Sequence, residues 1–244
     1  MKLKNKVVII TGASSGVGKA TAIEFAKKRS KVVLVARRLE KLTELENRLS
    51  RINSNIISIK TDVTNSKEVQ RLFQKVKEKF GRVNILINNA GCGMSKTLLE
   101  LTEQEWDKVH NVNLKGVFLC SQEAVRLMQS NKTKGHLITI SSIAGIYGAP
   151  GYSAYCSSKH AVTGFKRSLR LELWKKGIKV SMIFPARIKT EFFKDYQNKP
   201  SGRQMLSAKD IAQYLVAIAS RNQFSVQYYR LRNFFKRVSN FILP

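Results

Sequence analysis

The chain has 244 residues, of which 43% are hydrophobic and 25% are charged. This length fits one large domain with a substantial core, and the composition excludes a disordered or fibrous protein. Forty-four Lys and Arg against sixteen Asp and Glu give a formal net charge of +28, which would attract nucleic acid, anionic lipid or phosphorylated ligands. The basic residues are spread along the chain on faces expected to be solvated, so we interpret most of them as a general basic background.

The cysteines and the hydrophobic runs indicate in which cellular compartment the protein is expected. Cys92, Cys120 and Cys156 have neither CxxC nor metal-ligand spacing, so we expect free thiols, a reducing compartment and no metal. The amino-terminal apolar run is too short for a signal peptide or a membrane span. Residues 135 to 158 carry no Asp, Glu, Lys or Arg, but glycines, serines, tyrosines and a proline interrupt them, and we predict a buried region with loops. A cytoplasmic protein is expected.

Short β-branched runs alternate with amphipathic stretches along most of the chain. Strands are predicted at residues 6 to 11, 31 to 36, 56 to 60, 83 to 88, 136 to 141 and 179 to 184. Helices are predicted at residues 16 to 29, 38 to 51, 66 to 80, 103 to 130 and 153 to 177. Nearly continuous apolar strands that alternate with helices predict right-handed βαβ crossovers and a parallel sheet with helices on both faces.

The pattern changes after residue 185. Residues 186 to 206 have no clear period and are predicted to cover the substrate site. A helix is expected from an N-cap at Ser207, with Asp210 at the third helical position, to about residue 220. A seventh strand, SVQYYRLR at 225 to 232, completes the prediction of a single doubly wound α/β domain, residues 1 to 244, with a mostly parallel seven-stranded sheet.

The carboxyl-terminal tail, residues 231 to 244, has an amphipathic pattern. Basic residues occupy the faces away from an apolar stripe, which consists of Leu231, Phe234, Phe235, Val238, Phe241 and Ile242. Such a tail can lie on an anionic membrane as a peripheral contact, or pack against its own domain or a sister subunit. We favour the second interpretation.

A glycine-rich turn, TGASSGVGKA, follows the first predicted strand and opens the first predicted helix. Gly12, Gly16 and Gly18 allow a tight turn and a close approach of the backbone to a ligand, and the helix N-terminus offers unpaired N–H groups to a pyrophosphate. The sequence therefore predicts a nucleotide site here.

The second strand ends in Ala36, Arg37 and Arg38, where an acidic residue would bind the ribose 2′-OH of NAD. Two guanidinium groups favour a 2′-phosphate, so we expect NADP(H) in preference to NAD(H), unless the arginines only solvate the start of a helix. After the third strand, Asp62 can either bind an adenine amino group or cap the next turn.

Tyr155 and Lys159 stand one helical turn apart in YSAYCSSKHA. A free tyrosine has a pKa of about 10, and a nearby ammonium in uncharged surroundings lowers that pKa toward the range useful for acid–base catalysis. Ser142, at the end of the fifth strand, can hydrogen-bond a substrate carbonyl oxygen, and Ser141 is the competing choice.

Several motifs in this order resemble those of the short-chain dehydrogenases/reductases. They are TGASSGVG at 11 to 18, DV at 62 and 63, NNAG at 88 to 91, NVNLKG at 111 to 116, the serine at 142, YCSSK at 155 to 159 and KT at 189 and 190. The resemblance covers nearly the whole chain and implies a Rossmann-type domain.

The resemblance implies four catalytic side chains. Tyr155 would be the general acid–base, and Ser142, thirteen positions before it, would orient the substrate oxygen. Lys159 would lower the pKa of Tyr155 and bind the nicotinamide ribose, and Asn113 would hold a water in a proton relay through Lys159, unless it only bends its helix.

The resemblance also implies a cofactor site. Asn89 would fix the strand beside the cofactor, Ile188 would pack near the nicotinamide, and Thr190 would contact the carboxamide or the phosphates. The full expected set is Gly12, Ser14, Ser15, Gly16, Val17, Gly18, Arg37, Arg38, Asp62, Val63, Asn89, Ala90, Gly91, Tyr155, Lys159, Pro185, Ile188 and Thr190. Ala186 stands where the family usually has glycine, which puts the substrate face in doubt.

The implied activity is hydride transfer between NADPH and a small carbonyl or secondary alcohol. Apolar residues of the covering segment favour a lipid, steroid or long-chain ketone, unless they simply seal the domain; they are Phe192, Phe193, Tyr196, Met205 and Leu206. The family implies a homodimer or homotetramer, and no nucleic acid partner is expected. The alternative is a non-catalytic NADP(H)-binding redox sensor or scaffold.

Overall fold

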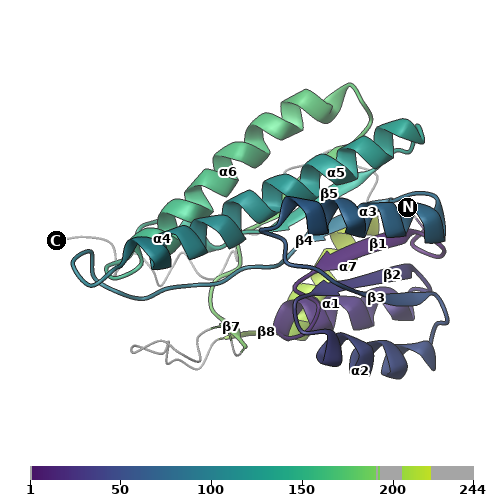
Figure 1. Cartoon of the computed structure of the whole chain (residues 1–244), viewed down its shortest axis with the longest axis horizontal. Helices are drawn as coiled ribbons and strands as arrows, with labels where there is room; N and C mark the ends of the chain where they lie inside the picture. Colours follow the sequence, from purple (N-terminus) through teal and green to yellow (C-terminus); the bar gives the residue numbers. More distant parts are fainter. Residues whose placement is uncertain (1, 191, 193–204, 221–244) are drawn as a thin grey trace.

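The computed structural model describes residues 2 to 190, 192 and 205 to 220, and its core is a six-stranded parallel sheet (Figure 1). The strands lie in the order β3-β2-β1-β4-β5-β6. Their bounds are Val7–Thr11 (β1), Lys31–Ala36 (β2), Ile56–Lys60 (β3), Ile85–Asn88 (β4), His136–Ile140 (β5) and Lys179–Ile183 (β6). The chain adds strands outward from β1 to β3 on one side of the sheet and then from β4 to β6 on the other side. This order is that of a doubly wound Rossmann-type sheet.

Helices cover both faces of the sheet (Figure 1). Their bounds are Gly16–Lys27 (α1), Leu39–Ser50 (α2), Ser66–Phe80 (α3), Glu103–His110 (α4), Gly116–Ser130 (α5), Ser153–Trp174 (α6) and Ala208–Ser220 (α7). Alternate residues of β1 explain the two layers, since Val8 and Ile10 pack with α1, α2 and α7, whereas Val7 and Ile9 pack with α3, α5 and α6. Both layers bury apolar side chains, so the strands are apolar throughout.

The predicted elements are confirmed with shifts of a few residues at their ends. The helix predicted over 103 to 130 contains a π-helical turn at Asn111–Lys115, which separates α4 from α5. The predicted N-cap at Ser207 is confirmed, since its Oγ accepts from the Asp210 N–H at 3.1 Å while the Asp210 carboxylate accepts from the Ser207 N–H at 3.0 Å.

Two expectations differ from the structure. Residues 146 to 150 were predicted as part of a buried region but are exposed, because they form the loop between the 3-10 turn Ile143–Gly145 and α6. The segment predicted to lack regular structure contains β7 (Ile188–Lys189), which pairs in parallel with β8 (Leu206–Ser207). These two-residue strands are too short to leave a periodic signal.

The predicted seventh strand at 225 to 232, the amphipathic tail at 231 to 244 and most of the covering segment lie outside the described residues. Within the described ranges, no helix is long and apolar enough to cross a membrane.

All six strands of the main sheet run in the same direction. Their carboxyl ends therefore lie along one edge, which we call the carboxyl edge, and their amino ends lie along the opposite amino edge (Figure 1). The carboxyl edge collects the loops after β1, β2, β3, β4, β5 and β6, and it is where ligands bind in open α/β sheets.

Candidate active site

The glycine loop forms a close-packed turn between β1 and α1. Gly12 and Gly16 have positive φ values of 67° and 53°, a conformation that glycine adopts without steric cost. A Cβ on Gly18 would lie 2.2 Å from the Gly12 carbonyl oxygen. Because these positions carry no side chains, the turn is left open, and a phosphate can approach the backbone N–H groups of the loop.

Thr11, which sequence reasoning did not select, connects this loop to the end of β4. Its Oγ1 accepts from the N–H groups of Asn89 and Ala90, both at 3.0 Å. The Asn89 side-chain amide donates to the carbonyls of Thr11 at 2.8 Å and Gly12 at 3.2 Å. Asn89 therefore fixes the two strand ends, as the resemblance implied. The only signal for Thr11 was its position just before Gly12.

Arg38 lies against the glycine loop. Its guanidinium donates to Ser14 Oγ at 2.9 Å and to Ser15 Oγ at 2.9 Å, so it does more than solvate the start of α2. Arg37, at the end of β2, is exposed. The two guanidinium groups place positive charge at the position where the ribose of a dinucleotide would be bound.

Asp62 forms a local turn. Its Oδ1 accepts from the backbone N–H of Thr64 at 2.9 Å and from the Thr64 hydroxyl at 2.8 Å. Of the two roles that the sequence left open, the structure shows the capping role. Val63, the next residue, is buried, and a Cβ on Gly116 would meet its side chain at 2.7 Å.

The π-helical turn presents Asn113 to the carboxyl edge. The Asn113 side chain pairs with the backbone of Cys92, since its Oδ1 accepts from the Cys92 N–H at 2.9 Å and its Nδ2 donates to the Cys92 carbonyl at 2.8 Å. Nδ2 also donates to Ser158 Oγ at 3.0 Å. A Cβ on Gly91 would lie 3.1 Å from Asn113 Oδ1 and 3.7 Å from Lys159 Nζ. Asn113, Gly91 and Lys159 are therefore neighbours, and no sequence signal pointed to Cys92 or Ser158.

The structure decides between the two serines. Ser141 is buried, and its Oγ has no hydrogen-bond partner among the described residues. A Cβ on Gly145 would lie 2.8 Å from this Oγ, so the hydroxyl is covered by backbone. Ser142 is half-buried, accepts from the Ala144 N–H at 3.2 Å and hydrogen-bonds the Tyr155 side chain. Of the two serines, Ser142 is therefore the one that contacts Tyr155.

Lys159 was expected to lower the pKa of Tyr155, and the structure shows a different balance. Burial raises the pKa of Tyr155 to about 12, and the hydrogen bond with Ser142 offsets only part of this effect. Burial also lowers the pKa of Lys159, to about 8. Lys159 Nζ lies 5.6 Å from the centroid of the Tyr155 ring and donates to the Ile140 carbonyl at 3.4 Å. The phenol is thus held in its protonated form at neutral pH.

Positive charge extends along the carboxyl edge. Burial raises the pKa of the Cys92 thiol, whereas the positive charges of Lys108, Lys159 and Arg37 lower it. These cations come from α4, α6 and the end of β2, so their fields meet at one place. An anionic ligand is favoured there.

The segment after β6 returns to the glycine loop. The Pro185 carbonyl accepts from the Ile143 N–H at 3.1 Å, and Ile188 packs on the core layer that includes Val17. A Cβ on Gly16 would lie 3.5 Å from Thr190 Cγ2. Ile188 and Thr190, which follow β6, therefore lie beside Gly16 and Val17 at the start of α1.

Phe192 lies over the catalytic candidates. Its ring centroid is 5.8 Å from that of Tyr155, and its N–H donates to Thr190 Oγ1 at 3.3 Å. An aromatic ring at this position adds an apolar wall beside the Tyr155 side chain.

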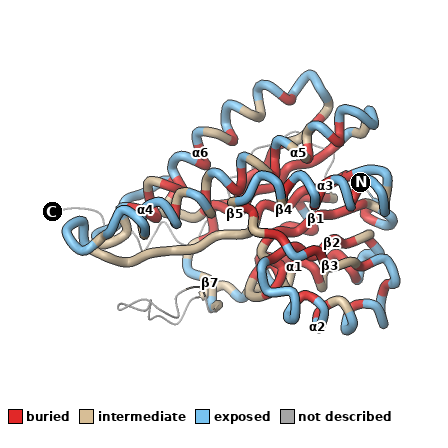
Figure 2. The backbone as a smooth tube through the Cα atoms, in the orientation of Figure 1, coloured by how far each residue is buried: buried red, intermediate tan, exposed pale blue. Residues whose placement is uncertain are grey.

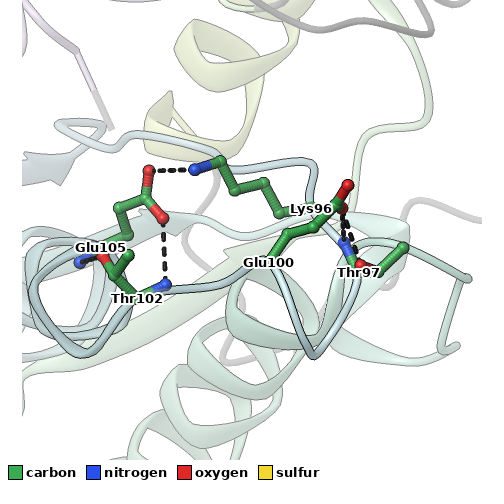
Figure 3. A network of polar contacts seen from close by, with 5 residues as sticks. All are labelled: Lys96, Thr97, Glu100, Thr102 and Glu105. Atoms are coloured by element: carbon green, nitrogen blue, oxygen red, sulfur yellow. Dashed lines mark hydrogen bonds and ion pairs between the residues drawn. The ribbon is translucent and has the colours of Figure 1, made fainter.

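A polar network holds the loop between β4 and α4 (Figure 3). Lys96 Nζ contacts Glu105 Oε1 at 2.7 Å, and Glu105 closes a capping box with Thr102. The Thr97 hydroxyl donates to the Glu100 carboxylate at 2.7 Å, and these hydrogen bonds lower the pKa of the Glu100 carboxyl. The loop they fix carries two apolar side chains into solvent, Leu98 at 76% and Leu99 at 98% exposure.

A doubly wound sheet with a glycine loop, an Asn113 turn and a Ser142–Tyr155–Lys159 cluster defines a nucleotide-dependent oxidoreductase site. The family model of the short chain dehydrogenases matches residues 6 to 201. The chain therefore belongs to the short-chain dehydrogenase/reductase family, whose members bind a nicotinamide cofactor and act on alcohol or carbonyl groups of small molecules.

Relatives of known name agree with this assignment. A 3-oxoacyl-[acyl-carrier-protein] reductase of Buchnera aphidicola is 38% identical over 218 residues, covering 89% of this chain and 84% of the relative. A 3beta-hydroxysteroid dehydrogenase of Mediterraneibacter gnavus is 37% identical over 186 residues, covering 76% and 67% of the two chains. A Burkholderia phymatum short-chain dehydrogenase/reductase solved in complex with NAD superposes with a TM-score of 0.87 at 27% identity, covering 98% of this chain and 93% of that one.

Proposed function

We propose that this protein is an NADP(H)-dependent reductase of apolar carbonyl compounds. The observation that carries the proposal is the buried Tyr155 phenol, hydrogen-bonded to Ser142 beside Lys159, at the same edge as the glycine loop and the two arginines. The nicotinamide nucleotide, when bound, supplies the hydride, and the protein supplies position and a proton.

The proton is the part of the reaction that this chain provides. Ser142 and Tyr155 present two hydroxyl groups to one point, where a substrate carbonyl oxygen would accept both hydrogen bonds. Tyr155 is protonated at neutral pH, so its hydroxyl can donate its proton to that oxygen. Lys159, with a pKa of about 8, and Asn113 would return a proton to Tyr155.

The preference for NADP(H) rests on the end of β2. Arg37 is exposed, and Arg38 is held by Ser14 and Ser15. An acidic side chain that would bind a free 2′-OH is missing from residues 36 to 38. Guanidinium groups pair well with phosphate, so a 2′-phosphate gains contacts here that a hydroxyl lacks. The Burkholderia relative was solved with NAD, so the preference requires its own test.

The preference for an apolar substrate rests on the entrance to the site. Phe192 lies against Tyr155, and the loops at 91 to 101 and 146 to 152 are joined by the Lys96 N–H bond to the Gly151 carbonyl at 2.8 Å. These loops expose Leu98, Leu99, Ile146 and Tyr147. Apolar side chains on both loops would cover an acyl chain or a fused ring system.

We also propose that the protein is a homo-oligomer through the face of α4, α5 and α6. Phe118 is 40% exposed and meets Phe165 edge to face, with ring centroids 6.2 Å apart. The two rings line a hollow with His110, Leu114 and Lys115. An exposed aromatic pair in a hollow is suited to burial by a second copy.

Titration of the purified protein with NADPH and with NADH, followed by nicotinamide fluorescence, tests the cofactor assignment. We expect NADPH to bind more tightly and Arg37→Asp to weaken its binding by about tenfold or more. The matched control is Arg71→Asp on α3, which makes the same change of charge at an exposed position and should leave both affinities unchanged.

Addition of apolar ketones to the NADPH complex tests the reaction. Oxidation of NADPH by long-chain or steroid ketones, and not by small polar ones, supports the assigned substrate class. Equal affinity for NADH would remove the NADP(H) preference, and failure to bind either nucleotide would refute the proposed function.

A further inference from the structure

Basic residues that are scattered in the sequence gather at the amino edge of the sheet. The segments that precede the six strands are residues 2 to 6, 27 to 31, 51 to 55, 77 to 84, 131 to 135 and 174 to 179. They contain sixteen Lys and Arg residues and one acidic residue, Glu78. More than a third of the basic residues of the chain therefore lie along one side of the molecule, and we call these segments the basic edge.

Backbone hydrogen bonds show that the segments are neighbours. The Val32 N–H donates to Asn55 and the Lys31 N–H to Lys6, both at 2.9 Å. On the other half of the sheet, the His136 N–H donates to Asn84 at 2.9 Å and the Lys179 N–H to Gly135 at 2.8 Å. The basic segments thus form a row across the whole sheet, on the side where Figure 1 places the N-terminus and the far ends of α5 and α6.

Helix dipoles account for only part of this charge. Cations are favoured in the last turn of a helix, and Lys27, Lys77 and Lys79 occupy such positions. The last turns of α5 and α6 contain no basic residue. The cations near those helices follow the helix end, and residues 2 to 6 follow no described helix, so the row is more extensive than helix stability requires.

Exposed apolar side chains border the row at its two ends. Ile52, before β3, is 52% exposed, and Trp174, before β6, is 51% exposed. Leu171, one turn before Trp174 on α6, is 78% exposed. β3 and β6 are the outer strands of the sheet. Figure 2 shows these connecting segments as largely exposed.

We propose that the basic edge is a docking surface for an anionic lipid bilayer. Lys and Arg next to an anionic leaflet attract the membrane, and tryptophan and aliphatic side chains at the border enter the headgroup region. A single-stranded nucleic acid would instead require exposed aromatic rings within the basic row to stack its bases. Phe80, within the row, packs against the core and has Lys31 Nζ over its ring at 5.4 Å from the centroid, and Trp174 lies at the end of the row. Docking at the amino edge leaves the carboxyl edge and its active site open.

This surface is separate from the proposed oligomer face. Trp174 follows Phe165 by nine residues on α6, which is about two and a half helical turns. The two side chains therefore project from opposite sides of the helix, so a second copy that buries Phe165 and Phe118 would leave Trp174 uncovered.

Co-sedimentation of the full chain with vesicles tests the proposal. We expect binding to vesicles of phosphatidylcholine and phosphatidylserine in equal amounts, no binding to phosphatidylcholine alone, and loss of binding as salt is raised. Replacing four lysines of the basic edge (Lys132→Gln, Lys134→Gln, Lys175→Gln and Lys176→Gln) should weaken vesicle binding by about tenfold or more. Thermal unfolding and NADPH binding should be unchanged, since these side chains are exposed and far from the site.

The matched control removes the same charge elsewhere, at exposed positions outside the basic edge and outside the proposed oligomer face (Lys41→Gln, Lys60→Gln, Lys67→Gln and Lys209→Gln). It should bind vesicles as the parent protein does. Equal losses in the two variants would mean that net charge alone drives binding, and would refute a docking surface.

Tryptophan fluorescence locates the contact, because the chain has two tryptophans, Trp106 and Trp174. The emission should shift to the blue on vesicle binding in Trp106→Phe and not in Trp174→Phe. A shift that arises from Trp106 would overturn the proposal. So would burial of Trp174 by self-association without vesicles, or tighter binding to a homopolymer RNA than to the anionic vesicles.

Discussion

The two edges of one sheet differ in chemistry although the same six strands end at both. The carboxyl edge consists of residues 12 to 15, 36 to 38, 61 to 65, 89 to 102, 141 to 152 and 184 to 190. These segments hold five basic and two acidic residues, whereas the shorter segments of the basic edge hold sixteen basic residues and one acidic residue. The candidate catalytic groups are gathered at the first edge, and most of the exposed charge at the second.

Burial explains why the first edge has few charges. At the carboxyl edge, Tyr155, Lys159 and Asn113 are buried, and each charged group there changes the pKa values of its neighbours because the local dielectric constant is low. A row of lysines at that edge would disturb the acid–base groups. At the amino edge most of the charges are exposed to water and are largely screened from one another, although Lys6, Lys31 and Lys179 are half-buried.

Removal of the Tyr155 hydroxyl should have the largest effect and should be confined to the carboxyl edge. We expect Tyr155→Phe to lower kcat by about 10²- to 10⁴-fold, because the substrate oxygen loses its proton donor, while NADPH still binds. The measurements are NADPH oxidation and fluorescence titration. Tyr214→Phe, on α7, is the control and should retain activity. Full turnover by Tyr155→Phe would show that another group donates the proton.

A methyl group in the glycine loop should weaken both cofactor binding and folding. In Gly18→Ala the new Cβ would lie 2.2 Å from the Gly12 carbonyl oxygen, so the turn must shift, at a cost of roughly 1–3 kcal/mol. NADPH affinity should fall with the unfolding free energy, as measured by titration and urea unfolding. Gly164→Ala, on α6, has no atom within 4 Å of the new Cβ and should be neutral or stabilise the helix by up to about 1 kcal/mol. Similar destabilisation by both substitutions would contradict this account.

The amino edge should respond to pH through His136, the first residue of β5. Burial, followed by the positive charge of Lys179, lowers the pKa of His136 to about 3, whereas an unfolded chain has a histidine pKa of about 6.5. The unfolded state therefore binds more protons between these values, so stability falls as pH falls below about 6.5, by roughly 2 kcal/mol at about pH 5.

Urea unfolding at a series of pH values checks this expectation. His136→Gln retains a polar partner for Ser181, which contacts His136 Nε2 at 2.8 Å, and should lose most of the pH dependence between pH 5 and 7. The pH series should end near pH 5. Below that value the carboxyl groups of Glu100, Glu105 and Asp210, whose pKa values are lowered in the folded state, cause further losses of stability. Equal slopes for parent and variant would mean that His136 titrates normally.

Sequence patterns predicted the sheet well, because strands buried on both faces must be apolar throughout, as in β1 and β2. The order of motifs also predicted which residues approach the site, including Asn113 and Asn89. The sequence did not predict the π-helical turn, since a side-chain bond from Asn113 to the backbone of Cys92 depends on a loop distant in sequence.

The balance of pKa values at Tyr155 could not be predicted either. The four-residue spacing places Lys159 near Tyr155, but it does not say how deeply both are buried, and burial dominates both pKa values. Lys166 gives the same lesson. It counts among the basic residues of the chain, yet it is only 2% exposed, and its Nζ donates to Ser121 Oγ at 2.7 Å.

The sequence by itself determined the family and the doubly wound sheet and predicted a catalytic set that includes Ser142, because each depends on local periodicity or on motifs whose order along the chain is fixed. Only the tertiary structure covered the Ser141 hydroxyl with backbone, raised the pKa of Tyr155 through burial and gathered sixteen scattered cations at one edge. The physical reason is that burial and electrostatic fields depend on distances in space, and a parallel sheet brings to one edge segments that are far apart in the chain.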